Sequence, residues 1–239
     1  MPDLASTLRD LGLDFDAATI HRLAAYRDLL AGAGFNLTSL RDRDPEALVR
    51  RHIAESLAFG QLLDRRGLLE GPVRVLDIGA GAGLPGIPLK IAWPAIRLTL
   101  IESVGKKCRF MEGVAAALGL DGVDVLEGRA EDFARLPEQR ETYDLVVARA
   151  VAPLPVLVEY ALPYLRLGGR LVAPKGSAAL SEIDAAQRAL SELGGRLDDA
   201  PQLRPPDGTP QTVAILLKDA PTPDRYPRRA GIPSKRPIR

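Results

Sequence analysis

The pattern of hydrophobic and polar positions changes near residue 70. Beyond that point, short runs of branched and aliphatic residues alternate with segments of helical spacing. The runs predict strands over residues 73–78, 97–102, 123–127, 144–148 and 170–173, and a late strand over 212–218. The segments between them predict helices over residues 85–92, 106–118, 154–165 and 178–193. Such alternation indicates βαβ units, which form a largely parallel sheet with ligands at the carboxyl ends of its strands.

Before residue 70 the apolar positions follow helical spacing only. Asp16 can cap a helix, and the apolar residues that would share one of its faces are Ile20, Leu23, Ala24 and Leu30. Asp44 and Pro45 begin a second helix, whose apolar residues four positions apart are Val49, Ile53 and Leu57. The segment 35–40 follows two glycines and is predicted to be a loop. We therefore expect residues 1–70 to form a helical extension packed on an α/β domain of residues 71–219.

The composition excludes several classes of protein. The chain has 239 residues, a formal net charge of +1, one cysteine and two histidines. A single cysteine forms neither an internal disulfide nor a multi-cysteine metal site, so we expect no metal. No run of about 18 apolar residues could span a membrane, and the first residues show no signal-peptide pattern. We therefore expect a cytoplasmic protein without a membrane partner.

Residues 220–239 form a basic, proline-rich arm. The cations of its last 18 residues are Arg225, Arg228, Arg229, Lys235, Arg236 and Arg239, with Asp224 as the one acid. Composition alone favours a disordered, solvated tail. A basic tail also suits a phosphate-rich substrate such as RNA.

The stretch LDIGAGAGLPGIPL, residues 76–89, fits two ligand fingerprints. From Gly81 it fits the G-x-G-x-x-G of dinucleotide-binding proteins, and from Asp77 it fits the acidic D-x-G-x-G-x-G loop of S-adenosylmethionine methyltransferases. Both need glycine, because a strand that turns sharply into a helix beside a ligand needs positive φ or no Cβ. Asp77 favours the second fingerprint, since a carboxylate repels a pyrophosphate and attracts the ammonium of methionine.

Polar residues also follow the second and third strands. Glu102 ends the second strand, where an acid can accept hydrogen bonds from the ribose of either cofactor. The segment GRAED, residues 128–132, follows the third strand, where an adenine amine needs an acceptor. These residues favour an α/β class I (Rossmann-like) methyltransferase fold, mostly parallel with a late antiparallel strand. A dinucleotide site and a purely structural glycine-rich turn stay open as alternatives.

The end of the fourth strand indicates the kind of methyl acceptor. Residues 148–153 read ARAVAP and lack the [DNS]-P-P-[YFW] sequence that grips an exocyclic base amine. They also lack a Pro-Cys nucleophile, and Cys108 lies in a helical segment. An acceptor with its own lone pair, such as guanine N7, needs no general base, only in-line placement against the sulfonium carbon.

An ordered set of short motifs runs along nearly the whole chain. The motifs are NLT at 36–38, RHI at 51–53 with SL at 56–57, the 77–88 loop with its LPGIP, KK at 106–107, RAE at 129–131, RA at 149–150, KG at 175–176 and YPRRAGIP at 226–233. With these motifs the chain resembles the bacterial glucose-inhibited division protein B family, the small-subunit ribosomal RNA guanine-N7 methyltransferase G. The resemblance implies S-adenosyl-L-methionine as methyl donor and a guanine of 16S rRNA, naked or in the assembled 30S subunit, as acceptor.

The resemblance also implies roles for individual residues. Cofactor contacts are expected from Asp77, Gly79, Gly81, Leu84, Glu102, Ser103, Arg129, Ala130, Glu131 and Arg149. Arg149 and Lys175 are expected in the catalytic site, and RNA contacts from Asn36, Arg129, Lys175, Arg228 and Arg229. Methyl transfer moves positive charge from sulfur to the purine, so a guanidinium against N7 would oppose it. We therefore expect Arg149 and Lys175 on the methionine carboxylate, the guanine O6 edge or phosphates.

Three residues depart from the family pattern. Gln211 and Thr212 stand where family members often have Arg-His before the last strand, and Pro174 replaces a more usual leucine. The loss of that arginine puts part of the RNA site in doubt.

A non-enzymatic RNA-binding or ribosome-assembly protein with this fold is a further alternative, but three acids at the cofactor loop and strand ends argue against it. We expect a monomer.

Overall fold

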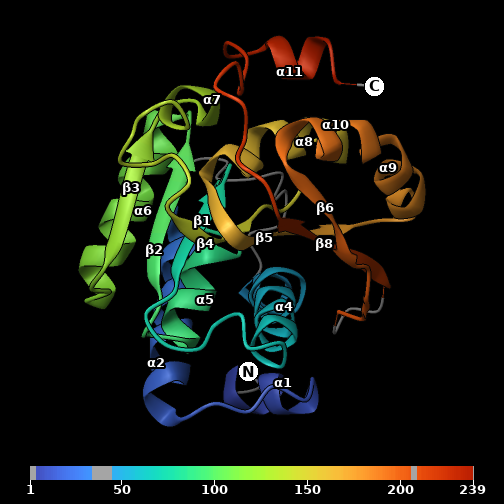
Figure 1. The fold of residues 1–239 in the computed structure, drawn as a ribbon. Coiled ribbons are helices and arrows are strands. Elements are labelled where there is room, and N and C mark those ends of the chain that lie inside the picture. Colours follow the sequence, from blue (N-terminus) through green and yellow to red (C-terminus); the bar gives the residue numbers. More distant parts are fainter. Residues whose placement is uncertain (1–3, 34–44, 206–208, 239) are drawn as a thin grey trace.

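The computed structural model describes residues 4–33, 45–205 and 209–238, and its centre is one sheet with helices on both faces (Figure 1). The strands are β1 Arg74–Ile78, β2 Arg97–Glu102, β3 Val123–Glu127, β4 Tyr143–Val147, β5 Leu165–Lys175, β6 Gly195–Asp199, β7 Gln202–Leu203 and β8 Gln211–Lys218. The helices before the sheet are α1 Leu4–Asp10, α2 Ala17–Gly32, α3 Pro45–Leu48, the π-helix η1 Val49–Ile53 and α4 Ala54–Asp64. The later ones are α5 Gly86–Ala92, α6 Gly105–Leu118, α7 Ala130–Phe133, α8 Leu154–Ala161, the 3-10 turn η2 Leu162–Tyr164, α9 Ala179–Ala185, α10 Gln187–Leu193 and α11 Ile232–Lys235.

The strand order creates a crevice at one edge of the sheet. Neighbouring strands follow the order β3-β2-β1-β4-β5-β8-β6, and β7 pairs with β8. Strands β1 to β5 pair in parallel, whereas β8 is antiparallel to both β5 and β6. The order reverses between β1 and β4, and ligands of such sheets bind at the carboxyl ends of the strands beside this reversal. The predicted α/β class, with its late antiparallel strand, is confirmed.

Alternate strand residues build two apolar cores, one on each face of the sheet. Val75 and Leu145 pack with the buried faces of α2, α4, α5 and α6, whereas Leu76 and Val146 pack with α8 and α10. Each fully buried aliphatic side chain contributes roughly 1.5–3 kcal/mol relative to exposure. The cores therefore hold the sheet rigidly beneath the loops at its carboxyl edge.

Several predicted elements need correction. The predicted helix 154–165 is wrong beyond Ala161, because Pro163 has no N–H to continue it and the chain passes through η2 into β5. The predicted helix 178–193 is interrupted at Ala186, between α9 and α10. Strand β5 is longer than predicted. The prediction was short because the glycines and Pro174 resemble strand breakers, but the strand already begins at Leu165, which pairs with Tyr143. Strands β6 and β7 and helices α1, α7 and α11 were not predicted.

The helices before the sheet share its core. The predicted cap is confirmed, since the Thr19 N–H donates to Asp16 Oδ1 at 2.7 Å. Helix α2 buries Leu23, Tyr26 and Leu30, whereas Ile20 and Ala24 are only half-buried. The second predicted helix begins at Pro45 as expected and continues through η1 into α4. The boundary near residue 70 stays a prediction, and we propose that residues 4–33 and 45–64 fold together with the sheet.

The C-terminal arm is packed rather than solvated. Figure 1 shows it running from β8 across the molecule to lie beside α7 and α8. Arg228 Nη2 lies 2.6 Å from Glu159 Oε2, and the Tyr226 hydroxyl donates to Glu192 at 2.6 Å. These contacts hold the arm against the folded domain, whereas composition alone favoured a disordered, solvated tail.

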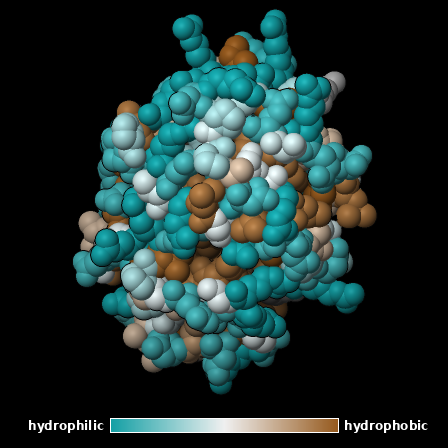
Figure 2. Space-filling view, viewed as in Figure 1, coloured by the Kyte–Doolittle hydropathy of each residue, from teal (hydrophilic) through white to brown (hydrophobic). Residues whose placement is uncertain are grey.

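The surface in Figure 2 is mostly hydrophilic, with hydrophobic side chains gathered near the middle of the view. No helix within residues 4–33, 45–205 and 209–238 has the length and apolar character needed to cross a bilayer. Exposed large hydrophobic side chains are dispersed over several elements.

Candidate active site

The loop after β1 is held in one conformation from both sides. Gly79 has φ +68°, and a Cβ there would lie 2.9 Å from Val151 Cγ2. The N–H groups of Gly79 and Ala80 donate to Ile101 O at 2.8 and 3.1 Å. The hydroxyl of Tyr26, buried in α2, donates to Ala82 O at 2.8 Å. The N-terminal helices therefore fix the loop that the sequence assigns to the cofactor.

Asp77 lies beneath this loop rather than on its surface. Its side chain is fully buried, and its Oδ2 accepts from the Gly86 N–H at 2.9 Å. A Cβ on Gly86 would lie 2.9 Å from the same oxygen, so glycine permits this close approach. Burial raises the pKa of Asp77 to about 7, although the Gly86 hydrogen bond acts to lower it. Among the described residues, its Oδ1 has no hydrogen-bond partner.

A narrow recess lies at the carboxyl ends of β2 and β3. It brings together six predicted cofactor residues: Gly79, Glu102, Ser103, Arg129, Ala130 and Glu131. Glu102 is almost buried and accepts from the N–H groups of Gly81, Ser103 and Val104 at 3.1, 2.8 and 3.0 Å. Glu131 Oε1 accepts from the Gly231 N–H at 2.9 Å, so the C-terminal arm reaches the rim of this recess.

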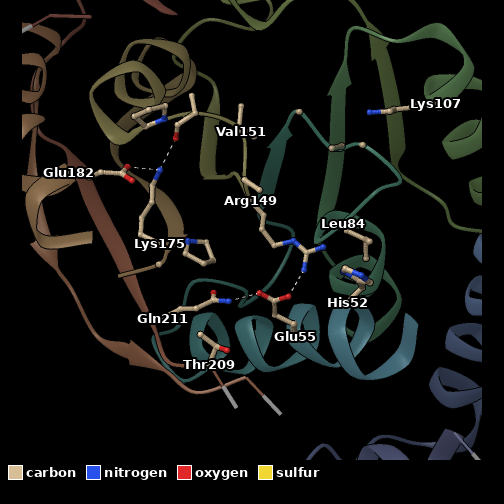
Figure 3. A pocket seen from close by; sticks show the side chains of 18 residues that line it. His52, Glu55, Leu84, Lys107, Arg149, Val151, Lys175, Glu182, Thr209 and Gln211 are labelled. Atoms are coloured by element: carbon tan, nitrogen blue, oxygen red, sulfur yellow. Dashed lines mark hydrogen bonds and ion pairs between the residues drawn. The ribbon is translucent and has the colours of Figure 1, made fainter. Parts of the chain in front are cut away.

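A larger pocket of about 790 Å³ adjoins the recess, and Gly79 and Val151 line both. Its volume is typical of small-molecule sites. It contains the other predicted residues on this side of the loop, namely Gly81, Leu84, Arg149 and Lys175. Figure 3 shows Arg149 near its centre, with Lys175 on one side and Leu84 on the other. Asp77 is not among the residues that line either space, so its direct contact with a ligand stays a prediction.

Every cation on the described pocket wall has an acidic partner. Arg149 Nη1 lies 2.9 Å from Glu55 Oε2, and Lys175 Nζ lies 2.9 Å from Glu182 Oε2. The Lys175 ammonium also donates to Ala152 O at 2.7 Å (Figure 3). Lys107 Nζ lies 3.6 Å from Glu102. The pairs leave the wall close to electrically balanced, which limits repulsion of a cationic ligand.

His52 contributes a neutral imidazole to the pocket. Burial and the nearby Arg149 lower its pKa to about 4. It lies in the π-helix η1, one turn before Glu55, and π-helical turns often occur at functional sites. His52 therefore packs beside the pocket without carrying charge at neutral pH.

Glu55 was not predicted from the sequence, although it lies on this wall between Arg149 and Gln211. Its partners Arg149 and Gln211 are 94 and 156 residues away along the chain. The Gln211 Nε2 donates to Glu55 Oε1 at 2.7 Å, so the departure from the family's arginine leaves Glu55 with a neutral donor. No local pattern signals contacts between such distant residues.

Comparison with known proteins identifies the family. The family model described as rRNA small subunit methyltransferase G, GidB, matches residues 19–207. The chain belongs to this family. A protein named ribosomal RNA small subunit methyltransferase G from Roseiflexus castenholzii is 44% identical, and the match covers 100% of both chains. One with the same name from Chloroflexus aggregans is 48% identical over 85% of this chain and 83% of its own.

Solved structures of low sequence identity share the fold. The O-methyltransferase TomG from Streptomyces achromogenes, in complex with SAM, has a TM-score of 0.59 and 20% identity, covering 92% of this chain and 100% of that chain. TrmN from Thermus thermophilus has a TM-score of 0.52 and 21% identity over 71% of this chain and 53% of that one. As a member of the methyltransferase G family, the chain is a methyltransferase, which favours the methyltransferase fingerprint of the glycine-rich loop over the dinucleotide one.

The RNA contacts predicted for this methyltransferase G family member differ in their surroundings. Arg129 is exposed at the rim of the narrow recess, and Arg229 is exposed on the arm. Arg228 instead binds Glu159, whose side chain is 1% exposed. Lys175 lines the large pocket. Asn36 lies outside the described residues, so its predicted role stays a prediction.

Proposed function

We propose that this chain transfers a methyl group from S-adenosylmethionine to N7 of a specific guanine in 16S rRNA. The observation that carries the proposal is the pair of adjoining cavities at the carboxyl edge of the sheet, the narrow recess and the pocket of Arg149 and Lys175, which share Gly79 as a lining residue. Membership in the methyltransferase G family supports rRNA as the acceptor. A ribosomal substrate would place the protein in the cytoplasm.

The residues around this space fit adenosylmethionine. A side chain at Gly79 would meet Val151, so glycine leaves room where the two cavities adjoin. Glu102 and Glu131 provide acceptors for ribose hydroxyls and the adenine amine, and Ser103, Arg129 and Ala130 complete that wall. At the other end, Arg149 provides donors for the methionine carboxylate, beside Gly81 and Leu84.

Adenosylmethionine supplies an electrophilic methyl group when it is bound. Guanine N7 carries a free lone pair, so the chain needs to place the base and needs no group to remove a proton. His52 fits this requirement because its pKa, lowered to about 4, makes it a weak base. Lys175 is restrained by Glu182 and Ala152 O and can meet a phosphate or O6 without approaching N7.

The test is transfer of labelled methyl groups to 30S subunits and to protein-free 16S rRNA, both from a strain that lacks this activity. The product is mapped by strand cleavage specific for 7-methylguanine. Label at a single guanine in either substrate supports the proposal, and the comparison shows which form is recognised. Absence of label from both, with adenosylmethionine binding intact, contradicts it.

We also propose that the protein acts as a monomer, because one chain supplies the recess and the pocket together. Sedimentation of the active protein tests this. Activity confined to a dimer would contradict it.

A further inference from the structure

Glu55 lines the pocket with a carboxylate that has one hydrogen-bond donor from the described residues on each oxygen. Glu55 lies in the first turn of α4, and its side chain points toward Arg149 and Gln211, as Figure 3 shows. Oε1 accepts from Gln211 Nε2 at 2.7 Å, and Oε2 accepts from Arg149 Nη1 at 2.9 Å. Each carboxylate oxygen can accept two hydrogen bonds, so, counting the donors from the described residues, one acceptor position remains on each oxygen. The side chain is 17% exposed, and the pocket is the space that it lines.

The other carboxylate of the described pocket wall is arranged differently. Glu182 Oε2 accepts from both Lys175 Nζ and the Leu154 N–H, at 2.9 and 2.7 Å. One of its oxygens therefore already has both partners. Among the described lining residues, Glu55 is the carboxylate that keeps a matched pair of acceptor positions.

Guanine carries the complementary pair of donors. Its N1–H and its 2-amino group lie side by side on the Watson–Crick edge, and proteins recognise that edge in unstacked RNA bases. An ionised carboxylate accepts two parallel hydrogen bonds in the same geometry in which it binds arginine. Adenine offers no such pair on this edge. A carboxylate at this place can therefore select guanine.

The positive charge that methyl transfer places on the purine also favours a carboxylate on this edge. As the bond from N7 to the methyl carbon forms and the bond from sulfur to that carbon breaks, positive charge passes to the purine. The purine N1–H and amino group become stronger donors, so a carboxylate on that edge binds the transition state better than the ground state. Arg149 and Lys175 cannot supply this stabilisation because they are cations.

We propose that Glu55 accepts hydrogen bonds from N1–H and the 2-amino group of the target guanine and thereby selects this base. The inference rests on the proposed function. Arg149 and Gln211 hold the carboxylate in place, which gives Gln211 a positioning role in this chain.

The test compares 16S rRNA with the same RNA carrying inosine, which lacks the 2-amino group, at the methylated position. The wild-type protein is expected to lose about tenfold to a hundredfold in kcat/KM on the inosine RNA. Glu55→Gln is expected to lose a similar factor on the guanine RNA and to show no preference for guanine over inosine. In the Glu55→Gln protein the new amide can still bond to Arg149 and Gln211, because the Gln211 amide can rotate to present its oxygen.

Two further variants separate base selection from pocket structure. Glu55→Asp retains a carboxylate and is expected to retain the preference for guanine, whereas Glu182→Gln is expected to keep the wild-type ratio of guanine to inosine rates. Equal wild-type rates on both RNAs would overturn the inference without any variant. A Glu55→Gln protein that keeps the wild-type preference would overturn it too. If the wild-type protein makes no 7-methylguanine in the guanine RNA, the proposed function fails together with the inference.

Discussion

Asp77 is a fully buried carboxyl group beneath the cofactor loop. Burial raises its pKa from 3.8 to about 7. Between these values the folded state binds more protons than the unfolded state, so the free energy of unfolding falls as pH rises through this window. The stabilisation from the protonated carboxyl is complete below pH 4 and is lost as the pH approaches and passes 7.

Asp77→Asn removes this titration and keeps an oxygen for the Gly86 N–H. We expect wild-type stability to fall relative to the variant between pH 4 and pH 7, by up to about 4 kcal/mol. Urea unfolding of both proteins at several pH values measures the difference. Parallel stability curves would show that Asp77 does not titrate in this range.

Single residues differ in how far the sequence predicts them. The sequence predicted Glu102, Arg149 and Lys175 as site residues because they lie at or just after the ends of predicted strands. Ligand-binding groups gather at the carboxyl ends of parallel strands. Glu55 was not predicted, because its ion pair with Arg149 depends on the tertiary contact between α4 and the loop after β4. Ala150 adopts φ +56° without being glycine, so the sharp turn after Arg149 also leaves no sequence signal.

At the scale of elements, helix α2 supports the cofactor loop through one hydrogen bond. Tyr26→Phe removes the donor to Ala82 O in a buried site. We expect a loss of about 1–2 kcal/mol in stability and a several-fold weaker affinity for adenosylmethionine, measured by denaturation and calorimetry. The affinity falls because the loop loses its restraint.

Tyr143→Phe is the matched control. Tyr143 is also a buried tyrosine, and its hydroxyl bonds to Thr99 and Gln139 away from both parts of the ligand space. It is expected to cost similar stability and leave cofactor affinity unchanged. Equal losses of affinity in the two variants would mean that α2 has no specific role in the loop.

The parallel half of the sheet was predictable, and the later half less so. Strands β1 to β3 are short apolar runs bounded by polar or glycine residues, so periodicity finds them. In β5, Gly168 and Gly169 fall at a register shift, because Leu165 pairs with Tyr143 and the next pair joins Arg170 to Leu145, so the strand accommodates the two glycines at an irregularity. Strand β6 is half-exposed and polar, so its structure comes from pairing with β8 rather than from its own pattern.

At the scale of the molecule, the C-terminal arm joins the far face of the sheet to the cofactor recess. Arg140 donates to Tyr226 O and Thr222 O at 2.9 and 2.7 Å, and Gly231 reaches Glu131. Composition could not show this, because the arm is held by an arginine and by acids of other elements, Arg140, Glu131 and Glu159. The packed arm places its exposed cations at a fixed position beside the recess.

Two adjacent arginines on this arm are expected to have separable roles. Arg228 forms several hydrogen bonds with the buried Glu159, whereas Arg229 is exposed. Arg228→Gln leaves a buried carboxylate without its cation and is expected to cost about 2–4 kcal/mol in stability. Arg229→Gln is expected to change stability by less than about 0.5 kcal/mol.

Binding to RNA separates the same two residues by its dependence on salt. If Arg229 contacts a phosphate, Arg229→Gln lowers the slope of log affinity against log salt by about one, because one fewer counterion is released. Arg228→Gln is expected to leave that slope unchanged under conditions where the variant is folded, since its guanidinium is already bound to Glu159. Filter binding of 16S rRNA at several salt concentrations measures both. A reduced slope in Arg228→Gln alone would reverse the assignment and mean that RNA displaces Glu159 from Arg228.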